Sequence, residues 1–416
     1  MDAISMPPHK AVGRSVGAWQ CSVRPSRRKD CLRRSMTSAA AKVTHEQLTK
    51  LPRINLTIFE YFCPVINSCK MNSNRLILSL LLLCALICCA ACHRKEKVTT
   101  PTMTTEQKAK ARNVKVDIFR YEQALFALDR QHLASGVEKL YGQVPDILVA
   151  KDCWKDPRMM QSLKDYLADT VIRVLYREIQ KQYPNLNDLQ SQLNSAFKIY
   201  LTHFPDASVP KFVTMISGID TYNPTVWGYD NTIIIDLDMY LGANFKFYSQ
   251  AHIPKFISAR YERKYLATDC FTKVMAYKHL PDKTLVSALD NMLDEGKKLF
   301  FTQVMFPDTP EMDILGYSPE KYEWAKKHEG QVWQYLMEKN MIYSKDDEVI
   351  RMLVDETPFT RVFGNESPGR IGAYIGLQII NSYMKQHPET ELKDIMLRTD
   401  AQKVLAESLY KPVLKK

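Results

Sequence analysis

The chain has 416 residues, of which 45% are hydrophobic and 25% are charged, a composition typical of a globular protein with a sizeable core. Fourteen glycines exclude a collagen-like chain, and 10% aromatic residues argue against general disorder. The net charge of +11 lies wholly in the first 97 residues, because residues 1–70 carry +8 and residues 71–97 carry +3. The rest is neutral and gives no support to nucleic-acid binding.

Residues 71–91 have the pattern of a bacterial lipoprotein signal peptide. Arg75 precedes an apolar run at 76–91, whose 16 residues would make a helix of roughly 24 Å, shorter than the ~30 Å hydrocarbon core of a bilayer. Two alanines stand directly before Cys92, although Cys89 occupies a position where leucine is common. We therefore expect cleavage before Cys92 and its acylation, with palmitate among the acyl chains. The alternative is a buried apolar helix.

The remaining boundaries follow from this signal. Residues 1–70 are basic, lack a strong periodicity and precede a signal that begins with its own Met71, so we predict a spurious or disordered extension. A basic cytoplasmic tail of a signal-anchored protein is the alternative. Residues 92–109 are predicted to be the lipidated cysteine and a flexible tether, and residues 110–416 a single domain, since no linker or repeat divides them.

The first part of this domain contains both helical and strand periodicities. Alternating apolar residues predict strands, and apolar residues at steps of three or four predict helices. A turn at 218–224 separates two of the strands, so we expect a β-hairpin or short sheet in the middle of the chain. The predicted strands are 114–119, 211–217 and 232–238, and the predicted helices are 121–129, 156–182 and 186–200.

After residue 241 the pattern is helical almost to the end. Ser318 and Ser367 are each followed by proline, which predicts a helix N-cap with proline in the first turn, and Pro281 is expected to begin another helix. The protein is therefore predicted to be α+β and mostly helical, with a small mid-chain sheet packed against long helices. The predicted helices are 252–262, 264–278, 282–303, 318–328, 329–339 and 367–386.

No sequence motif assigns an enzymatic activity. No two of the nine histidines are four residues apart, so a His-Glu-x-x-His zinc site is absent, as are a Gly-x-Ser-x-Gly elbow, a P-loop and a dinucleotide fingerprint. We predict no catalytic residue, no metal ligand and no cofactor. Asp236 and Asp238 alternate along one strand, where they could bind a cation but more often mark the wet face of an edge strand.

Only two cysteines lie in the domain. Cys153 and Cys270 are expected either to be two buried thiols or, in an oxidising compartment, to form one disulfide bond.

The densest signal is the glycine-containing segment from residue 365 to residue 385. Glycines four residues apart let another backbone approach one face of a helix closely, so a tightly packed core helix is the favoured interpretation. The glycine after Glu295 in the 282–303 helix is interpreted in the same way. The alternative is a ligand or partner site at the helix N-terminus, where free N–H groups favour an anion and Glu366 could pair with Arg370. The residues of this candidate site are Asn365, Glu366, Ser367, Pro368, Gly369, Arg370, Gly372 and Gly376.

Several stretches resemble the GldB family of gliding-motility lipoproteins from Bacteroidetes. The resemblance spans roughly residues 110–412 and is most specific in the segment 365–384. It implies an envelope lipoprotein anchored through Cys92, with the lipid bilayer and proteins of the gliding or type IX secretion apparatus as partners, and no established catalytic residues. The basic sequence after Cys92 favours a domain that faces the periplasm. The other matching stretches are 204–217, 234–242, 314–318 and Trp324 with Trp333.

The family also resembles, at a distance, zinc peptidases of the zincin type. The helix that would hold the metal lies near residues 265–275 and lacks both histidines, while Glu295 would stand in place of the third ligand. The resemblance thus implies a zincin-like fold that has lost its metal motif. The leading hypothesis is a non-catalytic lipoprotein that acts through protein contacts, with Asn365–Arg370 and the adjacent helix shaping a contact groove. A divergent metallopeptidase that uses Asp236, Asp238 or Glu295 is the alternative, and a general envelope-integrity lipoprotein is a third hypothesis.

Overall fold

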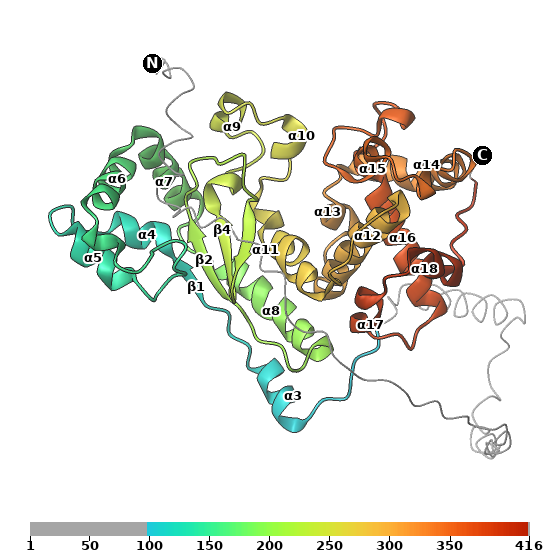
Figure 1. The fold of residues 1–416 in the computed structure, drawn as a ribbon, viewed down its shortest axis with the longest axis horizontal. Coiled ribbons are helices and arrows are strands. Elements are labelled where there is room, and N and C mark those ends of the chain that lie inside the picture. Colours follow the sequence, from blue (N-terminus) through green and yellow to red (C-terminus); the bar gives the residue numbers. More distant parts are fainter. Residues whose placement is uncertain (1–97, 415–416) are drawn as a thin grey trace, which may run out of the picture. The chain divides into compact units, whose positions relative to one another are not determined.

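The computed structural model describes residues 98–414 (Figure 1). The expected extension at 1–70, the signal peptide at 71–91 and the acylated Cys92 lie outside these residues. Of the helices in the described part, none is both long enough and apolar enough to cross a membrane.

A four-stranded sheet with the order β1-β2-β4-β3 forms the centre of the first half of the domain. The three strands β1, β2 and β4 are parallel, and β3 is antiparallel to β4. The expected hairpin is therefore not made by the two predicted strands, which pair in parallel. Instead β4 makes a hairpin with β3, which was missed because it is short and contains Gly228. The strands are β1 (Ile118–Arg120), β2 (Lys211–Met215), β3 (Val226–Tyr229) and β4 (Thr232–Asp236).

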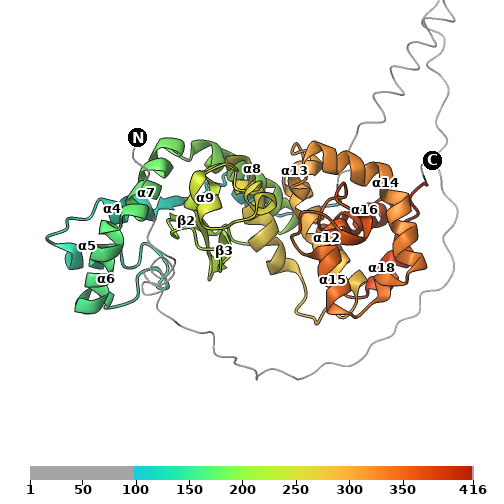
Figure 2. The ribbon, with the colours of Figure 1, turned by 90° about the horizontal axis from the view of Figure 1, so that it is seen from above.

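Some helices of the first half pack against this sheet, and others pack against one another (Figures 1 and 2). The helix predicted at 156–182 is broken at Asp169, whose backbone leaves the helical region and whose side chain accepts hydrogen bonds from the N–H groups of Val171 and Ile172. The helices are α3 (Thr105–Arg112), α4 (Tyr121–Phe126), α5 (Leu133–Leu140), α6 (Pro157–Ala168), α7 (Thr170–Gln182) and α8 (Asn187–His203).

The second half is helical, as predicted, but several boundaries differ. The helix expected from residue 282 begins after Ser287, which makes a capping box with Asp290. Ser318 caps its helix as predicted, and the two helices predicted at 318–339 are one. The elements are α9 (Lys246–Gln250), α10 (Lys255–Ser258), α11 (Leu266–Cys270), a π-helical turn (Phe271–Met275), α12 (Ala288–Met305), α13 (Glu311–Leu315), α14 (Pro319–Glu338), α15 (Asp347–Val354), α16 (Ile371–Gln386), α17 (Leu392–Leu397) and α18 (Ala401–Ser408).

Close contact between α12 and α16 forms the core of this half, and both views show the two helices side by side (Figures 1 and 2). A Cβ atom on Gly376 would lie 1.8 Å from the carbonyl oxygen of Met292, and one on Gly296 would lie 2.3 Å from the carbonyl carbon of Gly376. Gly372 faces α15 in the same way, since its Cβ would lie 2.8 Å from the carbonyl oxygen of Leu353. The expectation that these glycines permit close packing is confirmed.

The two cysteines occupy separate parts of the core and form no disulfide bond. Cys153 lies in a 3-10 turn at Cys153–Lys155 and Cys270 ends α11, and both side chains are buried. Of the two arrangements expected from the sequence, the structure therefore has the one with two buried thiols.

Candidate functional site

The segment before α16 is a closed loop and not a capped helix start. The helix begins at Ile371, preceded by Arg370 in the left-handed region (φ +54°), so the prediction that Ser367 caps it is wrong. The Ser367 hydroxyl instead donates to the Gly364 carbonyl (2.6 Å) and accepts from the Thr360 N–H (3.1 Å). The Thr360 hydroxyl in turn donates to the carbonyl of Pro368 (2.8 Å). These bonds close residues 360–368 into what we call the 360–368 loop.

The buried base and the exposed rim of the 360–368 loop differ in character. Ser367 and Pro368 are buried, and Gly369 is held so close to Thr357 that a Cβ would lie 1.9 Å from its carbonyl oxygen. Asn365 and Glu366 are exposed, and the Asn365 carbonyl accepts a hydrogen bond from Lys321. Of the predicted site residues in this segment, only these two therefore present side chains freely to solvent.

Arg370 ties the start of α16 to three other segments. Its guanidinium donates to Glu295 Oε2 (2.8 Å), to Glu356 Oε1 (2.9 Å) and to the carbonyl of Val354 (3.3 Å). The predicted pair between Glu366 and Arg370 is therefore wrong, because the left-handed backbone at Arg370 turns its side chain toward α12. Burial alone would lower the pKa of Arg370, but the charges of Glu356 and Glu295 raise it above its usual range.

Lys298 completes the pairing of Glu295. Its ammonium group, almost fully buried, binds Glu295 Oε1 and lies 3.5 Å from Asp294 Oδ2 and 2.8 Å from the Tyr277 hydroxyl. Burial alone would raise the pKa of Glu295, yet Arg370 and Lys298 hold it below its usual value. Both oxygens of Glu295 thus bind cations of this chain. We call Glu295, Lys298, Glu356 and Arg370 the Arg370 cluster.

A second buried cluster, which the sequence analysis missed, surrounds Asp269 in α11. This carboxylate is 1% exposed and accepts from the Tyr240 hydroxyl (2.7 Å), Arg260 Nη2 (2.6 Å) and Lys273 Nζ (2.8 Å). Thr225 joins it through the Tyr240 hydroxyl and Lys273 Nζ, each 2.9 Å from its Oγ1. Burial would raise the pKa of Asp269, but Lys273 and Arg260 lower it strongly. We call these five residues the Asp269 cluster.

The position of Asp269 bears on the expected zincin resemblance. Thr268, Asp269 and Thr272 stand at the spacing that His, Glu and His have in the zinc motif. The Thr272 hydroxyl lies 2.8 Å from that of Thr302 in α12, and the Thr268 hydroxyl donates to the Tyr265 carbonyl (3.1 Å). Among residues 98–414, no three His, Cys, Asp or Glu side chains lie close enough together to hold a metal ion. The polar groups at these positions therefore bind other groups of the protein.

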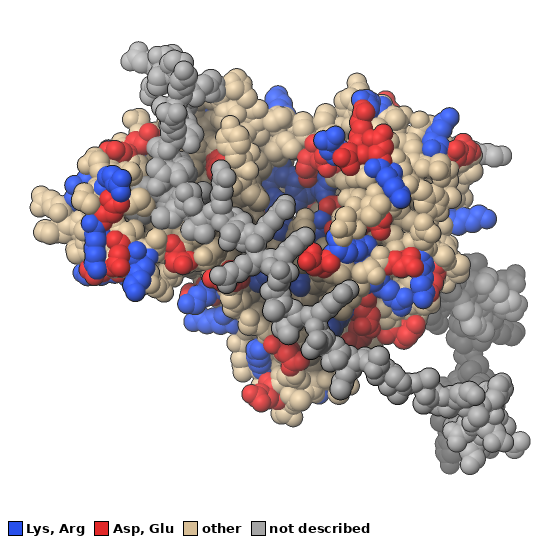
Figure 3. Space-filling view, in the orientation of Figure 1, with Lys and Arg blue, Asp and Glu red and all other residues tan. Residues whose placement is uncertain are grey.

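The two clusters are neighbours. Burial alone would lower the pKa of Arg260, but the charge of Asp269, helped by that of Glu356, raises it above its usual value. Arg370 acts in the opposite direction, so two members of the Arg370 cluster influence Arg260. Figure 3 shows a hollow between the regions of α10 and α13, where side chains of lysine and arginine gather. Arg260, Lys273 and Arg370 each bind a carboxylate. The arrangement is that of two neighbouring sets of ion pairs, one around Asp269 and one around Arg370.

Asp236 and Asp238 are not on a wet edge, because β4 is an inner strand buried along its whole length. Asp238 is fully buried and accepts hydrogen bonds from the N–H groups of Ser217 (2.9 Å) and Ile219 (2.7 Å). It thereby holds the turn after β2, in which Ile219 has a positive φ of 61°. Burial and then the charge of Asp238 raise the pKa of Asp236 well above its usual value, which favours a neutral acid.

Comparison with known proteins identifies the family. The model of the family described as gliding motility protein GldB matches residues 102–412. No curated protein and no solved structure matches the chain. The family match covers both clusters, the 360–368 loop and the whole sheet. The chain therefore belongs to the family of the gliding motility protein GldB.

Proposed function

We propose that this protein is an envelope lipoprotein, anchored through acylated Cys92 and facing the periplasm, that supports gliding motility or type IX secretion. The observation that carries the proposal is the family match over residues 102–412, which connects the chain to gliding. The pattern at residues 71–92 supports the anchor. In this proposal the protein acts through contacts with other envelope proteins and not through catalysis.

The contacts that the candidate acidic residues make within the protein support a non-catalytic role. Glu295 binds Arg370 and Lys298, Asp269 binds Arg260 and Lys273, and Asp238 holds a turn. Removing a cation from such a pair leaves a buried charge, so these acids are poorly suited to bind and release a metal or substrate. We infer that both clusters fix the fold.

The 360–368 loop is the proposed contact surface. Its base is fixed by Ser367 and Thr360 and by Lys321, which donates to the Ser367 carbonyl (2.8 Å), while the side chains of Val362, Asn365 and Glu366 are exposed. An apolar side chain among polar ones on a fixed loop is a suitable contact with another protein, since little conformational freedom is lost on binding. Gly372 and Gly376 have a packing role, away from this surface.

The proposal is tested in a deletion strain of the host bacterium, complemented with the chain that begins at Met71. We expect the deletion to stop gliding or to retain type IX cargo in the cell, and the shorter chain to restore both. Normal gliding and normal export in the deletion strain would contradict the proposed role.

Metal analysis of the purified protein tests the non-catalytic part separately. We expect no stoichiometric zinc, because Glu295 is paired with two cations. Stoichiometric zinc that Glu295→Ala removes would instead support the metallopeptidase hypothesis. Asn365→Ala serves as the control, since its exposed side chain lies outside both clusters.

A further inference from the structure

One face of α3 is firmly attached to the domain. Ala111 is buried where α3 packs against α8. Gln107 Nε2 donates to Asp206 Oδ1 (2.9 Å) and Lys110 Nζ donates to the carbonyl of Ala207 (2.7 Å). Thr104 begins the helix with a capping box. A short and very polar helix is thus held in one orientation, which also fixes the direction of its exposed side.

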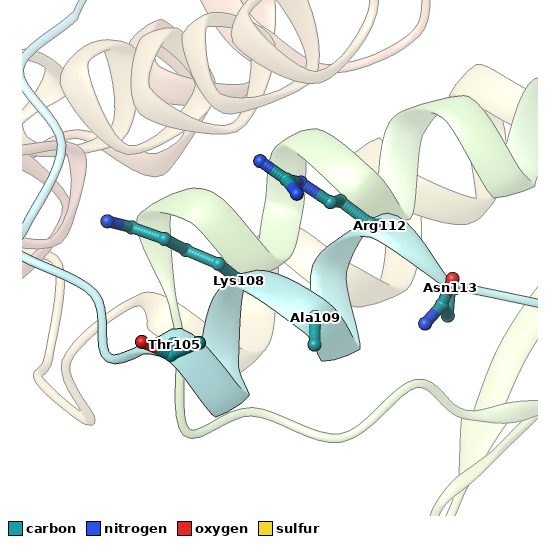
Figure 4. A pocket seen from close by; sticks show the side chains of 5 residues that line it. All are labelled: Thr105, Lys108, Ala109, Arg112 and Asn113. Atoms are coloured by element: carbon teal, nitrogen blue, oxygen red, sulfur yellow. The ribbon is translucent and has the colours of Figure 1, made fainter.

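The exposed side of α3, next to the packed face, carries two cations that have no acidic partner among the described residues. Lys108 and Arg112 are exposed, stand four residues apart, and make no ion pair with any residue of the described range. Figure 4 shows their side chains extending to the same side of the helix. Thr105, Ala109 and Asn113 lie beside them on the exposed side of the helix. We call this side of the helix, with its two cations, the outer face of α3.

The chain before α3 limits where this face can lie relative to an anchored Cys92. Thr99 forms a β-bridge with Glu391, and its hydroxyl donates to the carbonyl of Pro388 (2.6 Å). The chain from Cys92 to Thr99 therefore spans at most about 25 Å when fully extended, at about 3.5 Å per residue. From Thr99 the chain continues directly to α3, at the lower edge of the ribbon in Figure 1. A lipid on Cys92 would keep this side of the domain near the bilayer.

We propose that the outer face of α3 contacts the anionic headgroups of the membrane that holds Cys92. The inference rests on the lipid anchor of the proposed function and adds an orientation to it. Arg94, Lys95 and Lys97 in the tether add positive charge to the same end of the chain. Such charge is attracted to anionic lipid only within about a Debye length of the surface, roughly 8–10 Å at physiological salt. The tether is long enough to let the outer face of α3 reach that range, and the attraction itself is what would keep the face there.

The test uses the lipidated protein in vesicles of phosphatidylcholine with or without phosphatidylglycerol. A fluorophore on Asn113→Cys reports the distance to acceptors on the lipid headgroups by energy transfer, and one on Glu338→Cys in α14 serves as the reference. Both positions are exposed, while Cys153 and Cys270 are buried, so the label is selective. We expect transfer at position 113 to rise at least twofold with phosphatidylglycerol, and transfer at 338 to change little.

Charge reversal separates the contact from the anchor. The double variant Lys108→Glu/Arg112→Glu is expected to lose the phosphatidylglycerol-dependent rise while still floating with the vesicles. Lys339→Glu/Lys345→Glu is the control with the same change of charge at other exposed positions, and it should keep the rise. Equal transfer in both vesicle types with normal flotation would overturn the contact alone. A protein that does not float would overturn the anchor, and the contact with it.

Discussion

At the scale of single residues, Arg370 is the side chain on which the Arg370 cluster depends. Its removal leaves Glu295 with Lys298 alone and takes one partner from Glu356, and the loss of one member of a buried ion pair costs about 3 kcal/mol. We therefore expect Arg370→Met to lower the free energy of unfolding, measured by urea denaturation, by about that amount.

Arg361 provides a matched control for this experiment. It also pairs with a glutamate, Glu348 (2.7 Å), but both side chains are about 70% exposed. Exposed pairs contribute at most about 1 kcal/mol, so Arg361→Met should have little effect. Equal losses in the two variants would mean that the Arg370 cluster does not stabilise the fold.

We expect the protein to lose stability in acid because of two histidines, the buried His203 and the half-buried His279. Burial lowers the pKa of His203 and of His279 to about 4, and His279 also stacks on Phe204 with ring centroids 3.8 Å apart. The unfolded chain binds protons near pH 6.5 and the folded chain does not, so stability falls as the pH drops from about 6.5 toward 4. Each histidine should contribute about 2 kcal/mol of this loss by pH 5.

Variant His279→Gln isolates one of these contributions. Glutamine does not titrate, so the free energy of unfolding should fall less between pH 7 and pH 5 than in the parent protein. A parent-like pH profile for His279→Gln would show that His279 is protonated in the folded protein.

The sequence predicted some of these residues and missed others for a physical reason. Gly372 and Gly376 were predicted because their spacing on one helix is visible in the sequence. The Asp269 cluster was missed because its acid and its bases lie on separate elements, and only the tertiary fold brings Thr225, Tyr240 and Arg260 to Asp269. Arg370 was assigned the wrong partner because a positive φ reverses the direction expected from a regular helix start.

At the scale of elements, the crossing of α12 and α16 depends on the absence of side chains. An alanine at Gly376 would place Cβ 1.8 Å from a backbone oxygen of α12, and a backbone cannot move aside as a side chain can. We expect Gly376→Ala to lower the free energy of unfolding by about 3 kcal/mol or more, measured by urea denaturation.

Gly136 in α5 is the corresponding control. Its added Cβ would meet Leu128 Cδ2 at 2.7 Å, which is the mobile end of a side chain. The gain in helix propensity from glycine to alanine is about 1 kcal/mol and offsets part of this contact. Gly136→Ala should therefore change stability by less than about 1 kcal/mol. A small effect at Gly376 as well would mean that the two helices can separate at low cost.

Long amphipathic helices were predicted best. Elements whose conformation depends on tertiary contacts were predicted poorly. Helix α8 has a clear apolar stripe and was predicted closely, whereas for α14 the serine cap was identified but the helix was predicted as two. The π-helical turn after α11 and strand β3 carry no comparable local signal, since the turn packs on α12 and the strand on β4. Strand β4 runs parallel to β2 because the chain first passes through β3, which is antiparallel to β4, and no local sequence signal marks that strand.

At the scale of the whole molecule, the proposed role depends on a fixed surface within an anchored domain. The 360–368 loop is rigid at its base, so substitutions at its exposed rim should alter contacts without unfolding the protein. Val362→Asp with Glu366→Lys changes one apolar contact and one charge there. We expect this double variant to fail to restore gliding or cargo export in the deletion strain, while its abundance and urea denaturation match those of the parent chain.

The same strain distinguishes a contact surface from a general effect of replacing exposed charged side chains. Glu323 and Lys326 lie on the exposed side of α14, where they form an ion pair (2.9 Å). Exchanging the two, Glu323→Lys with Lys326→Glu, preserves that pair and the net charge, so function should be retained. If the loop variant restores gliding and export as fully as this control, the contact lies elsewhere on the domain. Loss in the loop variant alone would assign the contact to the rim of a loop that Ser367 and Thr360 hold in place.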